Sequence, residues 1–218
     1  MIFEYTEKET DYLKEKDKKL SPIIDKLGHI ERTVDSDLFS AVVHHIIGQQ
    51  ISTKAQETVW LRMTETLGAV TPESINNADR STLQSVGITF RKVDYIKDFS
   101  AKVVSGEFNL KEIESMPDDE AIKALSSLKG VGVWTAEMIL LFCLQRPNIL
   151  SYDDLAIQRG MRMVYRHKSI DRKLFEKYRK RLTPYCSVAS LYFWAVAGGA
   201  IPELTDPSKP KVNKKSGK

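Results

Sequence analysis

The chain has 218 residues, 42% of them hydrophobic, which is enough for one compact domain or for two small lobes that share a core. Its two cysteines, Cys143 and Cys186, are too few for a disulfide framework, stand in no metal-ligand spacing and cannot supply the four thiolates of an iron–sulfur cluster. No apolar run is long enough to span a bilayer, and the N-terminus lacks the core of a signal peptide. The composition therefore indicates a soluble protein of a reducing, intracellular compartment.

The formal net charge of +4 is distributed unevenly along the chain. Residues 208–218 carry five lysines and no acid, so the remainder has a net charge of −1. Residues 159–181 hold ten Lys or Arg residues against Asp171 and Glu176 alone. Such a basic run is typical of a surface that faces phosphate groups, and the alternative is an ordinary solvated helix face. We expect residues 208–218 to be a disordered tail that adds weak, salt-sensitive attraction to nucleic acid.

Hydrophobic residues recur at helical spacing along most of the chain, and no alternating run is followed by a hairpin turn. The sequence therefore predicts an all-α protein of about ten helices. In one of them, Val93, Ile96, Phe99 and Val103–Val104 are expected to form a single hydrophobic stripe. Residues 1–37 are expected to be helical as well and to pack against the C-terminal helices. The other predicted helices cover residues 38–47, 52–67, 72–78, 79–86, 89–105, 117–128, 134–145, 153–167, 171–182 and 186–198.

A turn with two glycines interrupts this pattern in the stretch LKGVGVWTAEMILL (128–141). Gly130 can adopt a positive φ, and Gly132 removes a side chain where another group has to approach the backbone. A helix starts directly afterwards, so its unpaired N–H groups and its dipole favour an anion at this point. The turn therefore predicts a binding site for a phosphate group.

The same turn carries the Leu-x-Gly-Val-Gly signature of the helix–hairpin–helix motif, which binds the DNA backbone without reading its sequence. Leu128, Val131 and Val133 are expected to pack the two helices together, and Lys129 adds a mobile positive charge. The alternative is a plain connection between two helices with glycine caps.

Five motifs in a fixed order make the chain similar to a known family over residues 38–200. It resembles the helix–hairpin–helix/Gly-Pro-Asp superfamily of DNA glycosylases, and within it the 3-methyladenine DNA glycosylase II branch. The motifs are IIGQQIS (46–52), VGITFRKVDYI (86–96), LKGVGVWTAEM (128–138), YDDLAIQRG (152–160) and TPYCSVASLYFWAVAGG (183–199).

The resemblance implies that Asp154 is the catalytic residue, twenty residues after Trp134. A carboxylate at this place would stabilise the positive charge that develops on the sugar as an N-glycosylic bond breaks, and it would orient or deprotonate the attacking water. The alternative for Asp154 is a helix N-cap, a role that we assign instead to Asp153, either as the cap or as an anchor for the loop.

The resemblance also implies a pocket for an extruded base. Relatives that cut the DNA strand carry a nucleophilic lysine where this chain has Trp134, so a hydrolase that uses water is expected. The indole can stack on a flipped base, and cation–π attraction would favour a cationic alkylated purine by about 0.5–2 kcal/mol. Trp194 matches a second pocket tryptophan, whereas Met138 and Leu155 replace tyrosines of a bacterial relative. For both tryptophans the alternative is a role as core aromatics.

The turn GQQIS resembles the element that enters the duplex where the base has left. Gln50 matches the wedge position, and the alternative for it is an ordinary turn glutamine with its hydrogen bonds satisfied. Cys186 stands where relatives often carry arginine. His44 and His45 are more typical of one buried and one exposed histidine than of a metal site. The expected DNA contacts are made by Gln49, Gln50, Ile51, Lys54, Lys129, Gly130, Val131, Gly132 and Thr135.

Together these features predict two helical lobes, roughly 38–130 and 1–37 with 131–207, with the active site in the cleft between them. We expect a monofunctional DNA glycosylase that excises alkylated purines, chiefly 3-methyladenine, from duplex DNA as the first step of base excision repair. The alternatives are a glycosylase for oxidised or deaminated bases and a non-catalytic DNA-binding module. The protein is expected to be a monomer without cofactor or catalytic metal, in the bacterial cytoplasm at the nucleoid or in a eukaryotic nucleus. The family implies a structural monovalent cation at the backbone of the hairpin.

Overall fold

The computed structural model describes residues 1–35 and 37–208, and it divides into two compact units. The first unit consists of Met1–Phe3 and Thr33–Arg146, and the second of Glu4–Arg32 and Pro147–Lys218. The expected basic tail lies outside the described residues except for Ser208.

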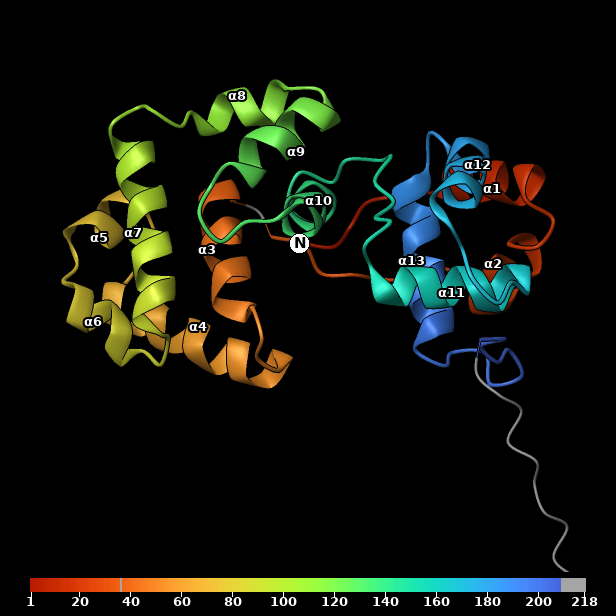
Figure 1. The fold of residues 1–218 in the computed structure, drawn as a ribbon, viewed down its shortest axis with the longest axis horizontal. Helices are drawn as coiled ribbons and strands as arrows, with labels where there is room; N and C mark the ends of the chain where they lie inside the picture. Colours follow the sequence, from red (N-terminus) through yellow and green to blue (C-terminus); the bar gives the residue numbers. More distant parts are fainter. Residues whose placement is uncertain (36, 209–218) are drawn as a thin grey trace, which may run out of the picture. The chain divides into compact units, whose positions relative to one another are not determined.

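The prediction of an all-α protein is confirmed, because the described residues form thirteen helices and their only β pairing is an isolated bridge between Ile2 and Thr33. Figure 1 labels the helices. Those of the first unit are α3 (Leu38–Gly48), α4 (Thr53–Leu67), α5 (Pro72–Asn77), α6 (Arg80–Ser85), α7 (Phe90–Val104), α8 (Leu110–Ser115), α9 (Asp118–Ser126) and α10 (Val133–Phe142). Those of the second unit are α1 (Glu7–Lys16), α2 (Ser21–Leu27), α11 (Leu155–Tyr165), α12 (Arg172–Leu182) and α13 (Cys186–Ala197).

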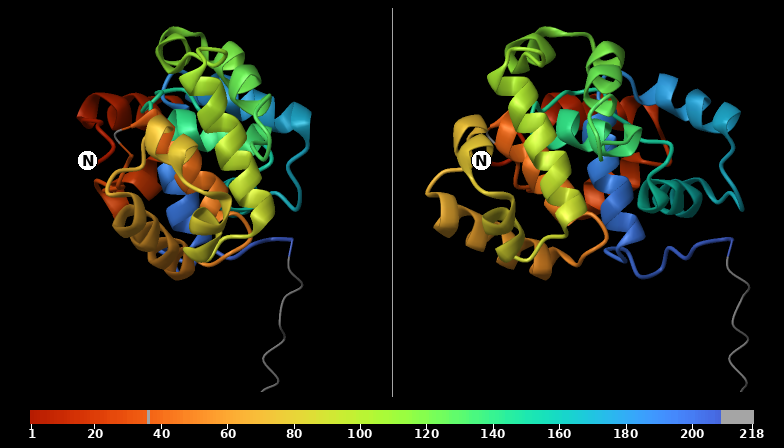
Figure 2. Two further views of the ribbon diagram at one scale, coloured as in Figure 1. Left: turned by 90° about the vertical axis from the view of Figure 1, so that its left-hand side faces the viewer. Right: turned by 60° about the vertical axis from the view of Figure 1, so that its left-hand side comes forward.

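Helix α7 is the centre of the first unit and packs against α3, α5 and α6. Its contact with α3 can be followed in both views of Figure 2. Val93, Ile96 and Phe99 of the predicted stripe are buried, as expected for a helix with one apolar face. The stripe does not continue to Val103 and Val104 as predicted, because Val103 is partly exposed and Val104 is 49% exposed at the end of the helix. Phe99 stacks on Phe39 of α3, with ring centroids 5.0 Å apart. The N-terminus of α7 is capped by the Thr89 side chain, which accepts from a backbone N–H of the first turn.

The boundary between the units differs from the expected one at residue 130. Helix α10 belongs to the first unit, because it packs against α9 and α3. Six of its ten residues are buried, so the hydrophobic sequence that follows the two-glycine turn forms the core of this unit.

The second unit is built on α11 and α13, which make the most extensive helix–helix contact of the described chain. Helices α1 and α2 pack against the C-terminal helices, as predicted for this part of residues 1–37. The hydroxyl of Tyr12 donates to the carbonyl of Thr183 at 2.7 Å, and that of Tyr192 donates to the carbonyl of Gly28 at 2.9 Å. Buried Asp17 also pairs with Arg181 at 3.1 Å.

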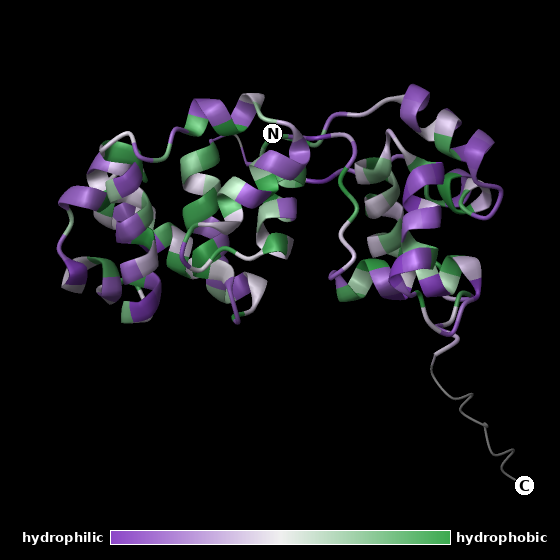
Figure 3. Ribbon diagram, turned by 45° about the horizontal axis from the view of Figure 1, so that its top comes forward, coloured by the Kyte–Doolittle hydropathy of each residue, from purple (hydrophilic) through white to green (hydrophobic). Residues whose placement is uncertain are grey.

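Hydrophobic and hydrophilic residues alternate around most helices of both units, as amphipathic helices of a water-exposed protein require (Figure 3). Among the described residues no helix combines the length and the apolar character needed to cross a membrane.

Candidate functional site

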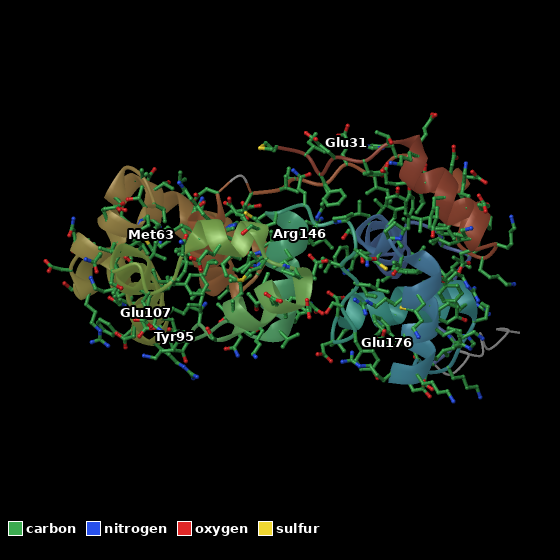
Figure 4. All side chains as sticks on the ribbon, turned by 90° about the horizontal axis from the view of Figure 1, so that it is seen from above. Glu31, Met63, Tyr95, Glu107, Arg146 and Glu176 are labelled. Carbon is green, nitrogen blue, oxygen red and sulfur yellow. The ribbon has the colours of Figure 1, made fainter. Side chains whose placement is uncertain are left out.

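The turn between α9 and α10 has the geometry that its two glycines predict. Gly130 has a φ of 83°, and a Cβ atom there would lie 2.4 Å from the ring of Tyr95, which is labelled in Figure 4. Gly132 is the N-cap of α10, and no side chain accepts a hydrogen bond from the first N–H groups of this helix as a cap. A Cβ atom at Gly132 would meet no atom within 4 Å. The backbone N–H groups that open α10 are therefore accessible to an approaching group.

The side chains around this turn follow the prediction only in part. Leu128 and Val131 are buried, as expected for residues that pack the two helices, but Val133 is 49% exposed. Val133 therefore does not have the buried packing position expected of it, because nearly half of it is exposed at the first position of α10. Lys129 pairs with Asp98 of α7 at 2.7 Å, and this carboxylate raises the pKa of the Lys129 ammonium. Its charge is thus partly compensated within the unit.

The turn between α3 and α4, which we call the wedge turn (residues 49–51), has an unusual backbone. Gln50 is exposed and has a φ of 60°, a left-handed conformation that a residue with a side chain seldom adopts. Ile51 is also exposed. The side-chain amide of Gln49 points the other way and donates to the carbonyl of Gly130 at 2.6 Å. Ser52 caps α4 by accepting from the N–H of Ala55 at 3.3 Å.

In the second unit, Asp154 is the N-cap of α11 and is 7% exposed. Its Oδ1 atom accepts hydrogen bonds from the backbone N–H groups of Ala156 and Ile157, both at 2.8 Å. The alternative assigned to Asp154 is thus observed, and the expectation that Asp153 caps this helix is wrong: α11 begins at Leu155, and Asp153 is exposed.

The N-cap geometry does not exclude a chemical role for Asp154, because a third donor reaches the same oxygen. The indole Nε1 of Trp194 in α13 donates to Asp154 Oδ1 at 3.2 Å. A helix N-cap needs only the backbone donors. Three N–H groups from two helices therefore hold this carboxylate in one orientation.

The remaining residues predicted for the base pocket and for DNA lie in different environments. Trp134, on the first turn of α10, is 43% exposed, and Leu155 is 85% exposed. Met138 and Thr135 are buried in α10, which fits core packing. A DNA contact of Thr135 would thus have to use its backbone, and the pocket role of Met138 stays a prediction. Lys54 is exposed on α4.

Several arginines of the basic run at 159–181 make structural contacts. Arg162 makes a bidentate ion pair with buried Asp206, with N–O distances of 3.0 and 2.6 Å. Arg181 makes an ion pair with Asp17. Arg172 lies over the ring of Tyr152, 4.5 Å from its centroid. The exposed lysines of this run are Lys168, Lys173, Lys177 and Lys180.

The histidine pair and the cysteines form neither a metal site nor a nucleophile. Within the described residues no group of three His, Cys, Asp or Glu side chains could hold a metal ion. His44 contacts Asp35 at 3.7 Å, whereas burial lowers the pKa of His45 to about 4. Burial raises the pKa of Cys143 to about 12 and that of Cys186 to about 11, so both stay protonated thiols at neutral pH.

Comparison with protein families matches residues 43–184, which include the wedge turn, the hairpin and Asp154, to the HhH-GPD superfamily of base excision DNA repair proteins. The chain belongs to this superfamily. The DNA-3-methyladenine glycosylase 1 of Schizosaccharomyces pombe is 29% identical to this HhH-GPD chain over 79% of its length and 77% of the relative. A putative DNA-3-methyladenine glycosylase of Bacillus subtilis is 28% identical over 80% of the chain, which spans 64% of that relative.

Solved structures agree with this assignment to the HhH-GPD superfamily. The DNA-3-methyladenine glycosidase of Bacillus halodurans has a TM-score of 0.81 at 31% identity, covering 89% of this chain and 91% of the other. The Schizosaccharomyces pombe 3-methyladenine DNA glycosylase in complex with abasic DNA has a TM-score of 0.75 at 25% identity, covering 88% and 97%.

Two residues that shape the site were not singled out from the sequence. Lys92, inside the motif VGITFRKVDYI, donates to two carbonyls of the wedge turn region, and Gly160, inside YDDLAIQRG, lies against the backbone of α13. A glycine in the middle of a predicted helix is a usable signal of close helix packing. No local pattern predicts the contact of Lys92.

Proposed function

We propose that this chain is a DNA glycosylase of base excision repair that removes alkylated purines, chiefly 3-methyladenine, from duplex DNA. The names of its relatives in two kingdoms support a glycosylase acting on 3-methyladenine. The observation that carries the proposal is the Asp154 carboxylate, which is nearly buried and held by two backbone N–H groups and the indole of Trp194.

The proposed reaction breaks the bond between the sugar and the purine nitrogen. The electron pair of this bond leaves with the base, and a purine alkylated on a ring nitrogen is a good leaving group because it already carries positive charge. The sugar becomes oxocarbenium-like, and the fixed negative charge of Asp154 stabilises it without reorganisation. A water molecule then bonds to the sugar carbon, and Asp154 orients this water or accepts its proton.

We propose a monofunctional enzyme because Trp134 has no amine with which to attack the sugar. Its exposed indole offers a flat face on which an extruded base can stack. Cation–π attraction would favour a cationic base over a neutral one by about 0.5–2 kcal/mol, so the lesion itself contributes much of the discrimination.

The contacts to duplex DNA that we propose come from the hairpin and the wedge turn. The open approach at Gly132 suits a phosphate at the N-terminus of α10. Gln50 is exposed at the tip of the wedge turn, where an amide can fill the place of the extruded base and also hydrogen-bond the base left unpaired. The protein would act on DNA as a monomer.

A monovalent cation at the hairpin, which the family implies, would be held by backbone carbonyls. The carbonyl of Gly130 already accepts from Gln49, and that of Leu128 accepts from the N–H of Val131. Each carbonyl oxygen has a second lone pair, so the turn is compatible with such an ion. Its proposed role is to shape the turn, with no part in bond cleavage.

The change Asp154→Asn tests this function. Asparagine keeps an oxygen that can accept the same three hydrogen bonds, so the fold is retained while the charge is lost. Release of 3-methyladenine from methylated DNA, followed by chromatography of the free bases, should fall by about a hundredfold or more. Binding to a duplex with an abasic-site analogue should change little. If base release survives the substitution, Asp154 does not have the proposed role.

Two results would favour another function. A wild-type protein that binds lesion-containing duplex but releases no base would be a DNA-binding module. Incubation with damaged DNA and borohydride should trap no covalent adduct, and a trapped adduct would contradict the monofunctional proposal.

A further inference from the structure

We propose that Lys92 and Gln49 are positioning residues for base extrusion, which hold the wedge turn in its strained form and join it rigidly to the hairpin. This inference rests on the proposed function and adds the residues on which the extrusion step depends. The alternative is that both side chains only stabilise helix ends.

The backbone of the wedge turn is strained at Gln50. A left-handed conformation at Gln50 is less favourable than the usual helical or extended regions, because the Cβ atom comes close to the backbone carbonyl oxygen. Such a residue keeps this conformation only where its surroundings fix it. Gln50 is exposed, and within the described residues its side chain makes no hydrogen bond or ion pair, so we look to its neighbours for the groups that fix this conformation.

Lys92 supplies the fixing contacts on one side. Its ammonium donates to the carbonyls of Ile47 and Gln49, both at 2.7 Å, and so spans the end of α3 and the start of the wedge turn. Within the described residues Lys92 makes no salt bridge, and burial lowers its pKa. Its partners are therefore backbone oxygens that the last turn of a helix leaves unpaired.

Gln49 supplies the link to the hairpin. Its amide donates to the carbonyl of Gly130 at 2.6 Å across 81 residues of sequence. The ring of Tyr95 covers the other side of Gly130, where a side chain would not fit. Tyr95 and Lys92 are three residues apart and so lie on the same side of α7. One helix face thus supports both the wedge turn and the hairpin.

A rigid link of this kind has a defined mechanical effect. The hairpin is the proposed grip on the DNA backbone, and opening a base stack costs a few kcal/mol that the wedge has to offset. If the wedge turn is held at a fixed distance from the hairpin, it enters the base stack at one place. A mobile wedge turn would first have to be ordered, and this would cost part of the free energy available for opening the stack. Extrusion from a duplex should therefore depend on Lys92 and Gln49, whereas cleavage of an already unstacked nucleotide should not.

Lys97 provides a matched control for a purely structural effect. It lies on the same helix, is also partly buried, and donates to the carbonyls of Ile75, Asn76 and Ala78 at the end of α5, at 3.3, 3.1 and 2.6 Å. Lys97→Met removes the same kind of helix-end contact from a place that no proposed DNA contact uses.

The experiment compares Lys92→Met, Gln49→Ala, Lys92→Arg and Lys97→Met. Oligonucleotide duplex is methylated, one strand is recovered, and half of it is annealed again, so that both samples carry the same lesions. Lys92→Met and Gln49→Ala should lower base release from the duplex by about tenfold and release from the single strand by less than about twofold. Lys92→Arg should restore most of the duplex rate, and Lys97→Met should lower Tm without changing the duplex-to-single-strand ratio.

A second readout needs no base release. A duplex with 2-aminopurine beside an abasic-site analogue becomes more fluorescent when the wedge unstacks it, and this increase should be smaller for both variants than for the wild type. Equal loss on duplex and single strand, or an unchanged fluorescence increase in both variants, would overturn the inference. If the wild type raises the fluorescence but releases no base, the proposed function fails while the positioning role stands.

Discussion

Gly160 of α11 lies against the backbone of α13, and a Cβ atom at this position would be 2.2 Å from the carbonyl oxygen of Phe193. Such a distance is impossible without movement of one helix, because the clashing atom belongs to the main chain. The next residue after Phe193 is Trp194, whose indole reaches Asp154 at the start of α11. The close approach of two helices at Gly160 therefore sets the distance between the indole and the carboxylate.

Gly160→Ala should consequently affect both stability and chemistry. Overpacking of a core contact typically costs about 1–3 kcal/mol, so Tm should fall although alanine favours helix. Base release should fall more than stability alone explains, because the indole is moved away from Asp154. Thermal unfolding and single-turnover base release, measured well below Tm, separate the two effects. A variant with wild-type kinetics would show that the helix spacing does not matter for the carboxylate.

Trp194→Phe tests the hydrogen bond to Asp154 itself. Phenylalanine keeps an aromatic ring but removes the N–H donor, and a hydrogen bond to a charged group contributes about 1.5–3 kcal/mol. The single-turnover rate of base release should fall by about ten- to a hundredfold with little change in DNA affinity. Trp60→Phe, at a tryptophan of α4 that packs against His44, is the control and should leave the rate near that of the wild type. Equal effects of the two changes would argue for aromatic packing alone.

The sequence predicts the local parts of this arrangement well. The two glycines of the hairpin, the buried stripe of α7 and the helical class all follow from residue spacing, and the structure agrees with each except at the end of the stripe, where Val104 is exposed. The helix that starts after Asp154 was expected too. Its cap was assigned to Asp153, because two adjacent aspartates offer the same side chain and only the exact first helical residue distinguishes them.

The contacts that could not be predicted are those between segments far apart in sequence. Lys92 donates to main-chain carbonyls, and Gln49 does the same at Gly130, so neither contact leaves a pairing pattern among side chains. The ion pair of Lys129 with Asp98 is of the same kind, because it joins a charge of the hairpin turn to one on α7. Burial of Met138 depends on which face of an almost wholly apolar helix turns inward, and hydrophobic periodicity does not define a face in such a helix.

The ion pair of Arg162 and Asp206 should be important for stability. Asp206 is 7% exposed and also accepts from the N–H and hydroxyl of Ser208, and Arg162 holds its pKa far below the usual range. Removal of one partner of a buried pair typically costs about 3–5 kcal/mol, so Asp206→Asn should lower the urea midpoint substantially.

The matched control for Asp206 is an ion pair with similar geometry on the surface. Arg80 and Asp94 also make a bidentate ion pair, but both of these side chains are more than half exposed. Because solvent and salt screen an exposed pair, Asp94→Asn should shift the urea midpoint much less. Similar shifts for the two variants would mean that burial does not strengthen the Asp206 pair.

His45 should make the stability of the protein depend on pH in the mildly acidic range. Burial lowers its pKa in the folded state to about 4, although Asp35 opposes this shift, while the same side chain in the unfolded chain titrates near pH 6.5. The unfolded state therefore binds a proton below pH 6.5 that the folded state accepts only near pH 4, so the free energy of unfolding should fall through this window. The loss is at most about 3 kcal/mol. Asp35, whose pKa His44 lowers, reduces the free energy of unfolding only at lower pH.

Urea unfolding of the wild type and of His45→Gln at pH 7, 6 and 5 measures the effect of His45. The free energy of unfolding of the variant should change less with pH over this range. Parallel curves would show that His45 is accessible to protons in the folded protein.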